Sequence, residues 1–116
     1  MTAPWRIEYY KSPSGQEAIV DFINELEVLT QVKVTRTLEL LSEFNITLGA
    51  PHSKKLSGVP FWELRILGKD NVRIFYIAKT GKYFLILHGF KKKKQKTDAR
   101  EIKLALGRLS EYNARK

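Results

Sequence analysis

The chain has 116 residues, which is enough for one domain and too few for two. Hydrophobic residues make up 43% and charged residues 28%, with a formal net charge of +9, and this balance excludes a disordered or fibrous protein. The absence of cysteine excludes disulfide scaffolds, thiolate metal sites and cysteine nucleophiles.

The first half of the chain carries patterns of one strand and two helices. Apolar and polar or charged residues alternate over residues 5–10, which predicts a half-buried strand. Ser14 and Glu17 have the spacing of a capping box, and apolar residues then recur at helical intervals to about Glu27. A second apolar stripe follows Thr30, so we expect the two helices to form a hairpin.

The second half predicts three strands and a final helix. Residues 45–60 read as a loop with a basic middle. Three runs rich in aromatic and β-branched residues follow, at residues 61–67, 72–78 and 83–90. Short turns between them predict an antiparallel meander. Asp98 begins a helical stripe that continues toward Tyr112. The expected fold is therefore one α+β domain over residues 1–116: an N-terminal strand, a helical hairpin, a three-stranded antiparallel meander and a C-terminal helix.

The positive charge is concentrated in the second half. Residues 1–50 carry four basic and seven acidic residues, a net charge of −3, whereas residues 51–116 carry seventeen and five, a net charge of +12. A surface kept basic for solubility alone does not require this segregation. A polyanion is the favoured partner, and nucleic acid is the polyanion that a small domain meets most often.

Two arginines are the strongest candidates for phosphate binding. Within a strand, Glu63 and Arg65 share the face opposite to the apolar residues, and Arg73 on the next strand can lie beside Arg65 on that face. Guanidinium groups on neighbouring strands would form a phosphate clamp, because each offers paired planar donors and stays charged. The alternative is a surface salt bridge between Glu63 and one arginine.

Lysines surround this position on two sides. Lys54 and Lys55 precede the first meander strand, where a flexible ammonium group can reach a phosphate or a 2′-hydroxyl. A run of lysines follows the last strand, and such runs are usually solvated surface. We expect its first members to bind ligand: Lys91, Lys92 and Lys93.

Two further side chains near the last strand are candidates. His88 has the side chain suited to proton transfer at neutral pH, although a lone histidine is more often structural, and we rank it below the arginines as a general acid or base. An aromatic ring exposed on a sheet can stack on an unpaired base, and we expect Phe90 to do so.

Several classes of site are missing from the sequence. There is no Gly-rich phosphate loop, no Ser nucleophile elbow, no HExxH motif and no Cys/His cluster. Metal-dependent nucleases need clustered carboxylates, and the basic half has few, so we expect no metal and no small-molecule cofactor. Neither a signal peptide nor an apolar run near the ~20 residues of a membrane span is present, which predicts a cytoplasmic protein.

Four segments in this order resemble the phage-derived, HigB-like branch of the RelE/ParE toxin superfamily: residues 54–58 (KKLSG), 62–66 (WELRI), 72–76 (VRIFY) and 87–93 (LHGFKKK). The resemblance covers nearly the whole chain. It implies a RelE-like fold and a type II toxin, a ribosome-dependent messenger RNA endoribonuclease. Its expected partners are messenger RNA on the ribosome and a cognate helix-turn-helix antitoxin.

The resemblance also implies roles for single residues. In such enzymes the 2′-hydroxyl attacks the adjacent phosphate without a metal. Arg65 and Arg73 would hold the scissile phosphate, Lys54 or Lys55 would assist deprotonation, and Lys91 would lie near the leaving group. Some relatives carry a base-stacking tyrosine after the last strand, where this chain has residues 95–97 (QKT).

Two other functions remain open. One is a gyrase-inhibiting toxin of the ParE kind, which shares the fold, and the Lys54, Arg65 and Arg73 set disfavours it. The other is a non-catalytic nucleic-acid-binding module, for which the basic half would be sufficient.

Overall fold

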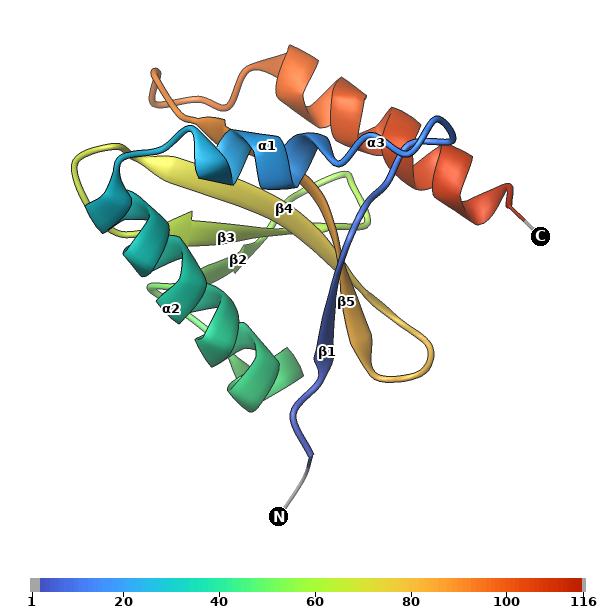
Figure 1. Ribbon diagram of the computed structural model, residues 1–116, viewed down its shortest axis with the longest axis horizontal. Coiled ribbons are helices and arrows are strands. Elements are labelled where there is room, and N and C mark those ends of the chain that lie inside the picture. Colours follow the sequence, from blue (N-terminus) through green and yellow to red (C-terminus); the bar gives the residue numbers. More distant parts are fainter. Residues whose placement is uncertain (1–2, 116) are drawn as a thin grey trace.

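The structure is a computed structural model that describes residues 3–115. One five-stranded sheet is combined with helices that flank it (Figure 1). In chain order the elements are β1 (Arg6–Tyr9), α1 (Ala18–Asn24), α2 (Val28–Phe44), the 3-10 turn η1 (Asn45–Thr47), β2 (Ser53–Lys55), β3 (Trp62–Ile66), β4 (Val72–Lys79), β5 (Tyr83–Lys91) and α3 (Ala99–Asn113). The expected α+β class is confirmed.

The sheet has the strand order β1-β5-β4-β3-β2. The pairs β2–β3, β3–β4 and β4–β5 are all antiparallel, so the expected meander of β3, β4 and β5 is confirmed. Strand β1 pairs with β5 in parallel. The N-terminal strand therefore closes one edge of the sheet, and β2 closes the other.

The helices lie on both sides of the sheet. Helices α1 and α2 cover one face, as Figure 1 shows, and the ring of Phe22 on α1 lies directly over Gly89 of β5. The neighbouring residue His88 points the other way and contacts Glu101 of α3. Because adjacent residues of a strand face opposite sides, α3 packs against the second face, at β5.

The main core lies between the sheet and the helical hairpin. Val34, Leu38 and Leu41 of α2 are spaced at helical intervals and are buried, as are Leu64 of β3 and Ile74 of β4. Each such side chain contributes about 1.5–3 kcal/mol when it is removed from water. This core fixes β3 and β4, the two strands that carry the candidate arginines.

Aromatic residues form a second cluster on the other face. The rings of Phe61 and Phe75 lie 4.9 Å apart between centroids, and Phe75 meets Phe90 edge to face at 5.1 Å. Phe61 and Phe75 are fully buried and Phe90 is 7% exposed. The sheet is therefore packed on both faces along β4 and β5, and only part of the second face reaches the surface.

Three local expectations need correction. Helix α1 is shorter than predicted and begins after Glu17, whose side chain makes no capping hydrogen bond, so the proposed capping box at Ser14 does not form. Helix α2 begins at Val28, two residues before Thr30. The segment expected to be a loop contains β2, held by pairing with β3 and by a buried hydrogen bond between the hydroxyls of Ser53 and Tyr76.

The start of α3 agrees with the sequence. Asp98 is its N-cap and accepts a hydrogen bond from the backbone N–H of Arg100 at 2.9 Å. Among residues 3–115, no helix combines the length and the apolar character needed to cross a membrane.

Candidate nucleic-acid interface

Arg65 and Arg73 lie directly opposite each other on β3 and β4. Residues paired in this way on antiparallel strands have Cβ atoms roughly 4.5–5.5 Å apart and side chains on the same face. The side chain of Arg65 is 33% exposed and that of Arg73 is 14% exposed. The convergence of two arginines expected from the sequence is therefore confirmed.

Glu63 lies between the two arginines. Its Oε1 atom is 3.3 Å from Nε of Arg65 and 3.6 Å from Nε of Arg73. The carboxylate is only 1% exposed, and a buried charge is tolerated when it is paired with opposite charge. The ion pair considered as an alternative is thus also present, and one carboxylate serves both guanidinium groups.

Burial lowers the pKa of Arg73, the attraction of Glu63 opposes this change, and the charge of Arg65 adds to it. Arginine begins from so high a pKa that the group stays charged. Its Nη1 donates to the backbone carbonyl of Val72 at 3.2 Å. Its Nε is buried 3.6 Å from Glu63 and has no hydrogen-bond partner among residues 3–115, so terminal N–H groups of Arg73 are the donors available to a ligand.

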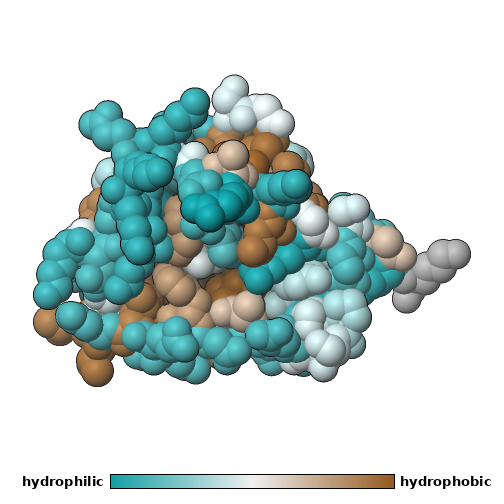
Figure 2. Space-filling view, turned by 90° about the horizontal axis from the view of Figure 1, so that it is seen from above, coloured by the Kyte–Doolittle hydropathy of each residue, from teal (hydrophilic) through white to brown (hydrophobic). Residues whose placement is uncertain are grey.

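A concave basic surface adjoins Arg73. It is shallow and largely open to solvent, has a volume of about 400 Å³, and is lined by Asn71, Arg73, Lys92, Lys93, Lys94 and Gln95. We call this surface the basic depression. It has four cationic side chains and no carboxylate in its lining, so it favours an anionic ligand. Figure 2, which looks down on the top of Figure 1, shows hydrophilic side chains crowded where the β5–α3 loop lies.

Asn71 fixes the start of that loop. The backbone N–H of Lys92 donates to the carbonyl of Asn71 at 2.9 Å, and Nδ2 of Asn71 donates to the carbonyl of Lys92 at 2.8 Å. Asn71 has a φ of +53°, a left-handed conformation that asparagine adopts more readily than most residues. Sequence reasoning missed Asn71 and Lys94, although an asparagine in a short turn is a recognisable signal.

The two lysines before β3 separate in the structure. Lys54 pairs with Glu63, so it lies on the face of the arginines, and it is exposed. Lys55 is the next residue along the strand and points to the other side. Its Nζ donates to the carbonyls of Leu56 and Val59. Of the two, Lys54 is the one placed near the arginine pair.

Lys91 also differs from its neighbours. Arg73 pairs with Phe90 across β4 and β5, and Lys91 pairs with Val72, so alternation places Lys91 on the opposite face from Arg73. A second hollow of about 230 Å³ shares three lysines with the basic depression and extends to α3; it is lined by Phe90, Lys91, Lys92, Lys93, Lys94, Lys96, Asp98, Arg100 and Glu101. Lys92 and Lys93 line both hollows and so lie beside Arg73, whereas Lys91 lines only the second of the two.

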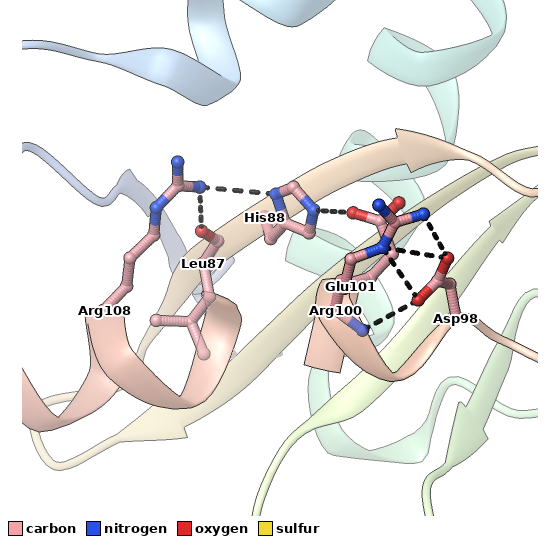
Figure 3. Close-up of polar contacts among 6 residues, drawn as sticks. All are labelled: Leu87, His88, Asp98, Arg100, Glu101 and Arg108. Carbon is pink, nitrogen blue, oxygen red and sulfur yellow. Dashed lines mark hydrogen bonds and ion pairs between the residues drawn. The ribbon is translucent and has the colours of Figure 1, made fainter. Parts of the chain in front are cut away.

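His88 is engaged within the protein (Figure 3). Its Nε2 lies 2.7 Å from Oε1 of Glu101, and its Nδ1 lies 3.4 Å from Nη1 of Arg108. Burial lowers the pKa of His88, the hydrogen bond with Glu101 opposes this, and Arg108 adds to it. A neutral ring that donates from Nε2 and accepts at Nδ1 fits both partners. Both nitrogens are occupied, so this geometry supports a link between β5 and α3 more than proton transfer to a ligand.

Phe90 is not an exposed stacking platform, and that expectation is wrong. The ring is 7% exposed and packs against Phe75 and, stacked at 5.4 Å, against His88. Alternation places Phe90 on the face of Arg73, but the aromatic cluster covers that part of the face. The polar part of the interface therefore consists of arginines and lysines.

The fold and the site define a small α+β protein whose sheet presents two paired arginines beside a lysine-rich depression. The chain matches the family described as "Phage derived protein Gp49-like" over residues 21–110, and it belongs to that family. The family is part of the RelE/HigB-like toxin superfamily of toxin–antitoxin systems. None of the curated proteins matches the chain. The matched range contains β2 to β5 in full, and with them both arginines and the basic depression.

Proposed function

We propose that this chain is the toxin of a type II toxin–antitoxin system, of the HigB-like branch, and that it cleaves messenger RNA on the ribosome without a metal ion. The 2′-hydroxyl attacks the adjacent phosphorus, the bond to the 5′-oxygen breaks, and the products are a 2′,3′-cyclic phosphate and a 5′-hydroxyl end. The protein's task is to align these atoms and to stabilise the charge that develops on the phosphate.

The arrangement of Arg65 and Arg73 carries the proposal. Their guanidinium groups face one side of the sheet in direct register, and the basic depression begins at Arg73. Charged donors held in place before the reaction stabilise the pentacovalent phosphate, and loss of one such donor costs roughly 10²–10³ in rate. We assign both arginines to the scissile phosphate.

Lysines supply the remaining roles. Lys54 lies on the same face as the arginines and is exposed, so its ammonium group is the candidate that assists deprotonation of the 2′-hydroxyl. Lys92 and Lys93 line the depression beside Arg73 and would hold the phosphates that flank the cleaved bond. Lys55 and Lys91 point away from the arginines, and we place them outside the reacting centre.

The partner of the toxin is a cognate antitoxin, which membership of a toxin–antitoxin family implies. We propose an antitoxin of the helix-turn-helix kind that neutralises the toxin until it is degraded. An adjacent gene of suitable size that encodes a helix-turn-helix pattern would support this assignment.

The experiment is cleavage of a reporter messenger RNA on translating ribosomes, with the 5′ ends of the products mapped. The intact protein should cut at defined codon positions, in the presence of a metal chelator that leaves the ribosomes assembled. Arg73→Ala should lower the cleavage rate about 10²- to 10³-fold while it weakens RNA binding only slightly. Arg36→Ala is the matched control, because it removes an exposed arginine from α2 on the other side of the sheet.

Two results would overturn the proposal. DNA damage in cells without messenger RNA cleavage would indicate a topoisomerase poison. RNA binding by the intact protein without cleavage or growth arrest would indicate a binding module.

A further inference from the structure

Glu63 has no place in the reaction described above, yet it lies beneath the arginine pair. It is a charged residue with only 1% of its surface exposed, at the second position of β3. Removal of a carboxylate from water costs several kcal/mol unless its partners compensate. The burial of Glu63 therefore cannot be explained by solubility. Within residues 3–115, its ionic partners are Arg65 and Arg73.

The geometry of the contacts determines which guanidinium atoms stay free. Glu63 approaches Arg65 and Arg73 through the Nε atom of each group. Guanidinium is a planar fork in which Nε–H shares one edge with a terminal N–H, so a carboxylate on that edge leaves the N–H groups at the far end of the fork directed away from itself. On Arg73 the Nη1 atom also donates to the carbonyl of Val72, and Nε lies buried 3.6 Å from Glu63 without forming a hydrogen bond. The carboxylate therefore sets the direction of the donors that are left for a ligand.

The charges of the three groups also indicate that the carboxylate of Glu63 holds the two arginines in place. Two guanidinium groups in direct register repel each other, and burial strengthens this repulsion because nearby water no longer screens it. One carboxylate between them removes much of this cost and leaves one net positive charge. Without the carboxylate, the arginines would be expected to turn toward water and away from each other.

We propose that Glu63 is a positioning residue that holds Arg65 and Arg73 together with their terminal amino groups directed at one phosphate. This inference rests on the proposed RNA cleavage. Glu63 acts through the arginines and touches no reacting atom, since its carboxylate is buried and Oε1 is shared between two cations. It is not the base that deprotonates the 2′-hydroxyl.

The kinetic test compares the intact protein with Glu63→Gln, which keeps the size of the side chain and removes its charge. Displacement of catalytic groups by about 1 Å can cost about 10²-fold in rate, so we expect kcat to fall 10- to 100-fold while KM changes less than about threefold. Because a carboxylate base is excluded, the pH profile of kcat should keep its shape. Glu63→Asp keeps the charge and shortens the side chain, and it provides a folded variant if Glu63→Gln unfolds.

A spectroscopic measurement on the protein alone separates this role from a general structural one. The Nε–Hε signals of Arg65 and Arg73 in ¹⁵N-labelled protein should be resolved and slow to exchange. In Glu63→Gln both signals should move toward the position of free arginine and exchange faster. Thr37→Ala is the matched control, because Thr37 is a buried polar residue of α2 that contacts neither arginine, and there both signals should stay in place.

The outcomes are distinguishable. If the intact protein cleaves RNA and Glu63→Gln cleaves at the same rate, or if the two arginine signals do not change, the positioning role is wrong and the proposed function stands. If the intact protein never cleaves RNA, the proposed function itself is wrong. A lower kcat, an unchanged pH profile and two displaced signals together support the role of Glu63.

Discussion

Asn71 and Lys92 hold each other through a reciprocal pair of backbone and side-chain hydrogen bonds of 2.9 and 2.8 Å, although 21 positions separate them in the sequence. Asn71 belongs to the turn before β4, and Lys92 is the first residue after β5. The contact joins the strand that carries Arg73 to the loop that carries the lysines. The side-chain amide of Asn71 therefore helps to hold the basic depression in place.

Substitution of Asn71 tests this dependence. Asn71→Gly keeps a residue that tolerates a φ of +53° and removes the side-chain donor, so the lysine positions should become less fixed. A net hydrogen bond contributes about 0.5–1.5 kcal/mol, and we expect affinity for single-stranded RNA to fall about 2- to 10-fold. Fluorescence anisotropy with a labelled single-stranded oligonucleotide measures this affinity. Unchanged affinity would show that the loop keeps its place without this bond.

The lysines of the depression should act mainly through phosphates. For single-stranded nucleic acid, each neutralised phosphate adds about 0.7 to the slope of log K against log salt concentration. The double variant Lys92→Ala/Lys93→Ala should reduce that slope by about 1.4. Lys33→Ala/Arg36→Ala removes the same charge from exposed positions on α2 and should leave the slope near that of the intact protein. Equal slopes for the two variants would mean that binding depends on net charge alone.

The arginine pair was predictable because two local rules suffice. Alternation along a strand places Glu63 and Arg65 on one face, and a short turn between two strands restricts the register that can pair Arg65 with Arg73. The lysine run was visible as composition. The sequence did not show which lysines face the arginines. Lys55 and Lys91 lie at strand ends, where a shift of one residue in the strand register moves a side chain to the other face of the sheet.

The errors share a different cause. Phe90 lies on the predicted face, but the rings of Phe75 on β4 and His88 on β5 pack against it, and such packing depends on the whole fold. The burial of Glu63 has the same origin. Strand β2 carries no apolar alternation and forms by pairing with β3, so tertiary contact overrides its local propensity.

Gly89 lies where α1 meets β5, and its lack of a side chain should matter for stability. A Cβ atom at this position would approach ring atoms of Phe22 to 2.9 and 3.1 Å. Gly89→Ala should therefore lower the free energy of unfolding by about 1–3 kcal/mol through overpacking. A Cβ atom at Gly107 in α3 would have no neighbouring atom within 4 Å. Gly107→Ala should therefore raise the free energy of unfolding by about 0.5–1 kcal/mol. Urea denaturation measures both, and a Gly89→Ala variant as stable as the intact protein would contradict the close packing.

The stability of the protein should depend on the protonation of His88. Its pKa in the folded state lies below the ordinary value of 6.5, chiefly because the ring is buried. As the pH falls below 6.5, His88 takes up a proton more readily in the unfolded chain than in the folded protein. The contribution of His88 to the free energy of unfolding is therefore fully present above pH 6.5 and decreases as the pH falls toward the pKa of the folded state. The melting temperature should fall between pH 7.5 and pH 5 more steeply in the intact protein than in His88→Gln.

Glu101 provides the matched variant for this pH dependence. Its hydrogen bond to Nε2 raises the pKa of His88 against the effect of burial, so Glu101→Gln should lower that pKa further. The loss of stability on acidification should then extend to lower pH than in the intact protein. Thermal melts of all three proteins across pH 5 to 8 make the comparison. Parallel profiles for the intact protein and His88→Gln would mean that His88 does not link folding to pH, and that its contacts with α3 persist in the protonated state.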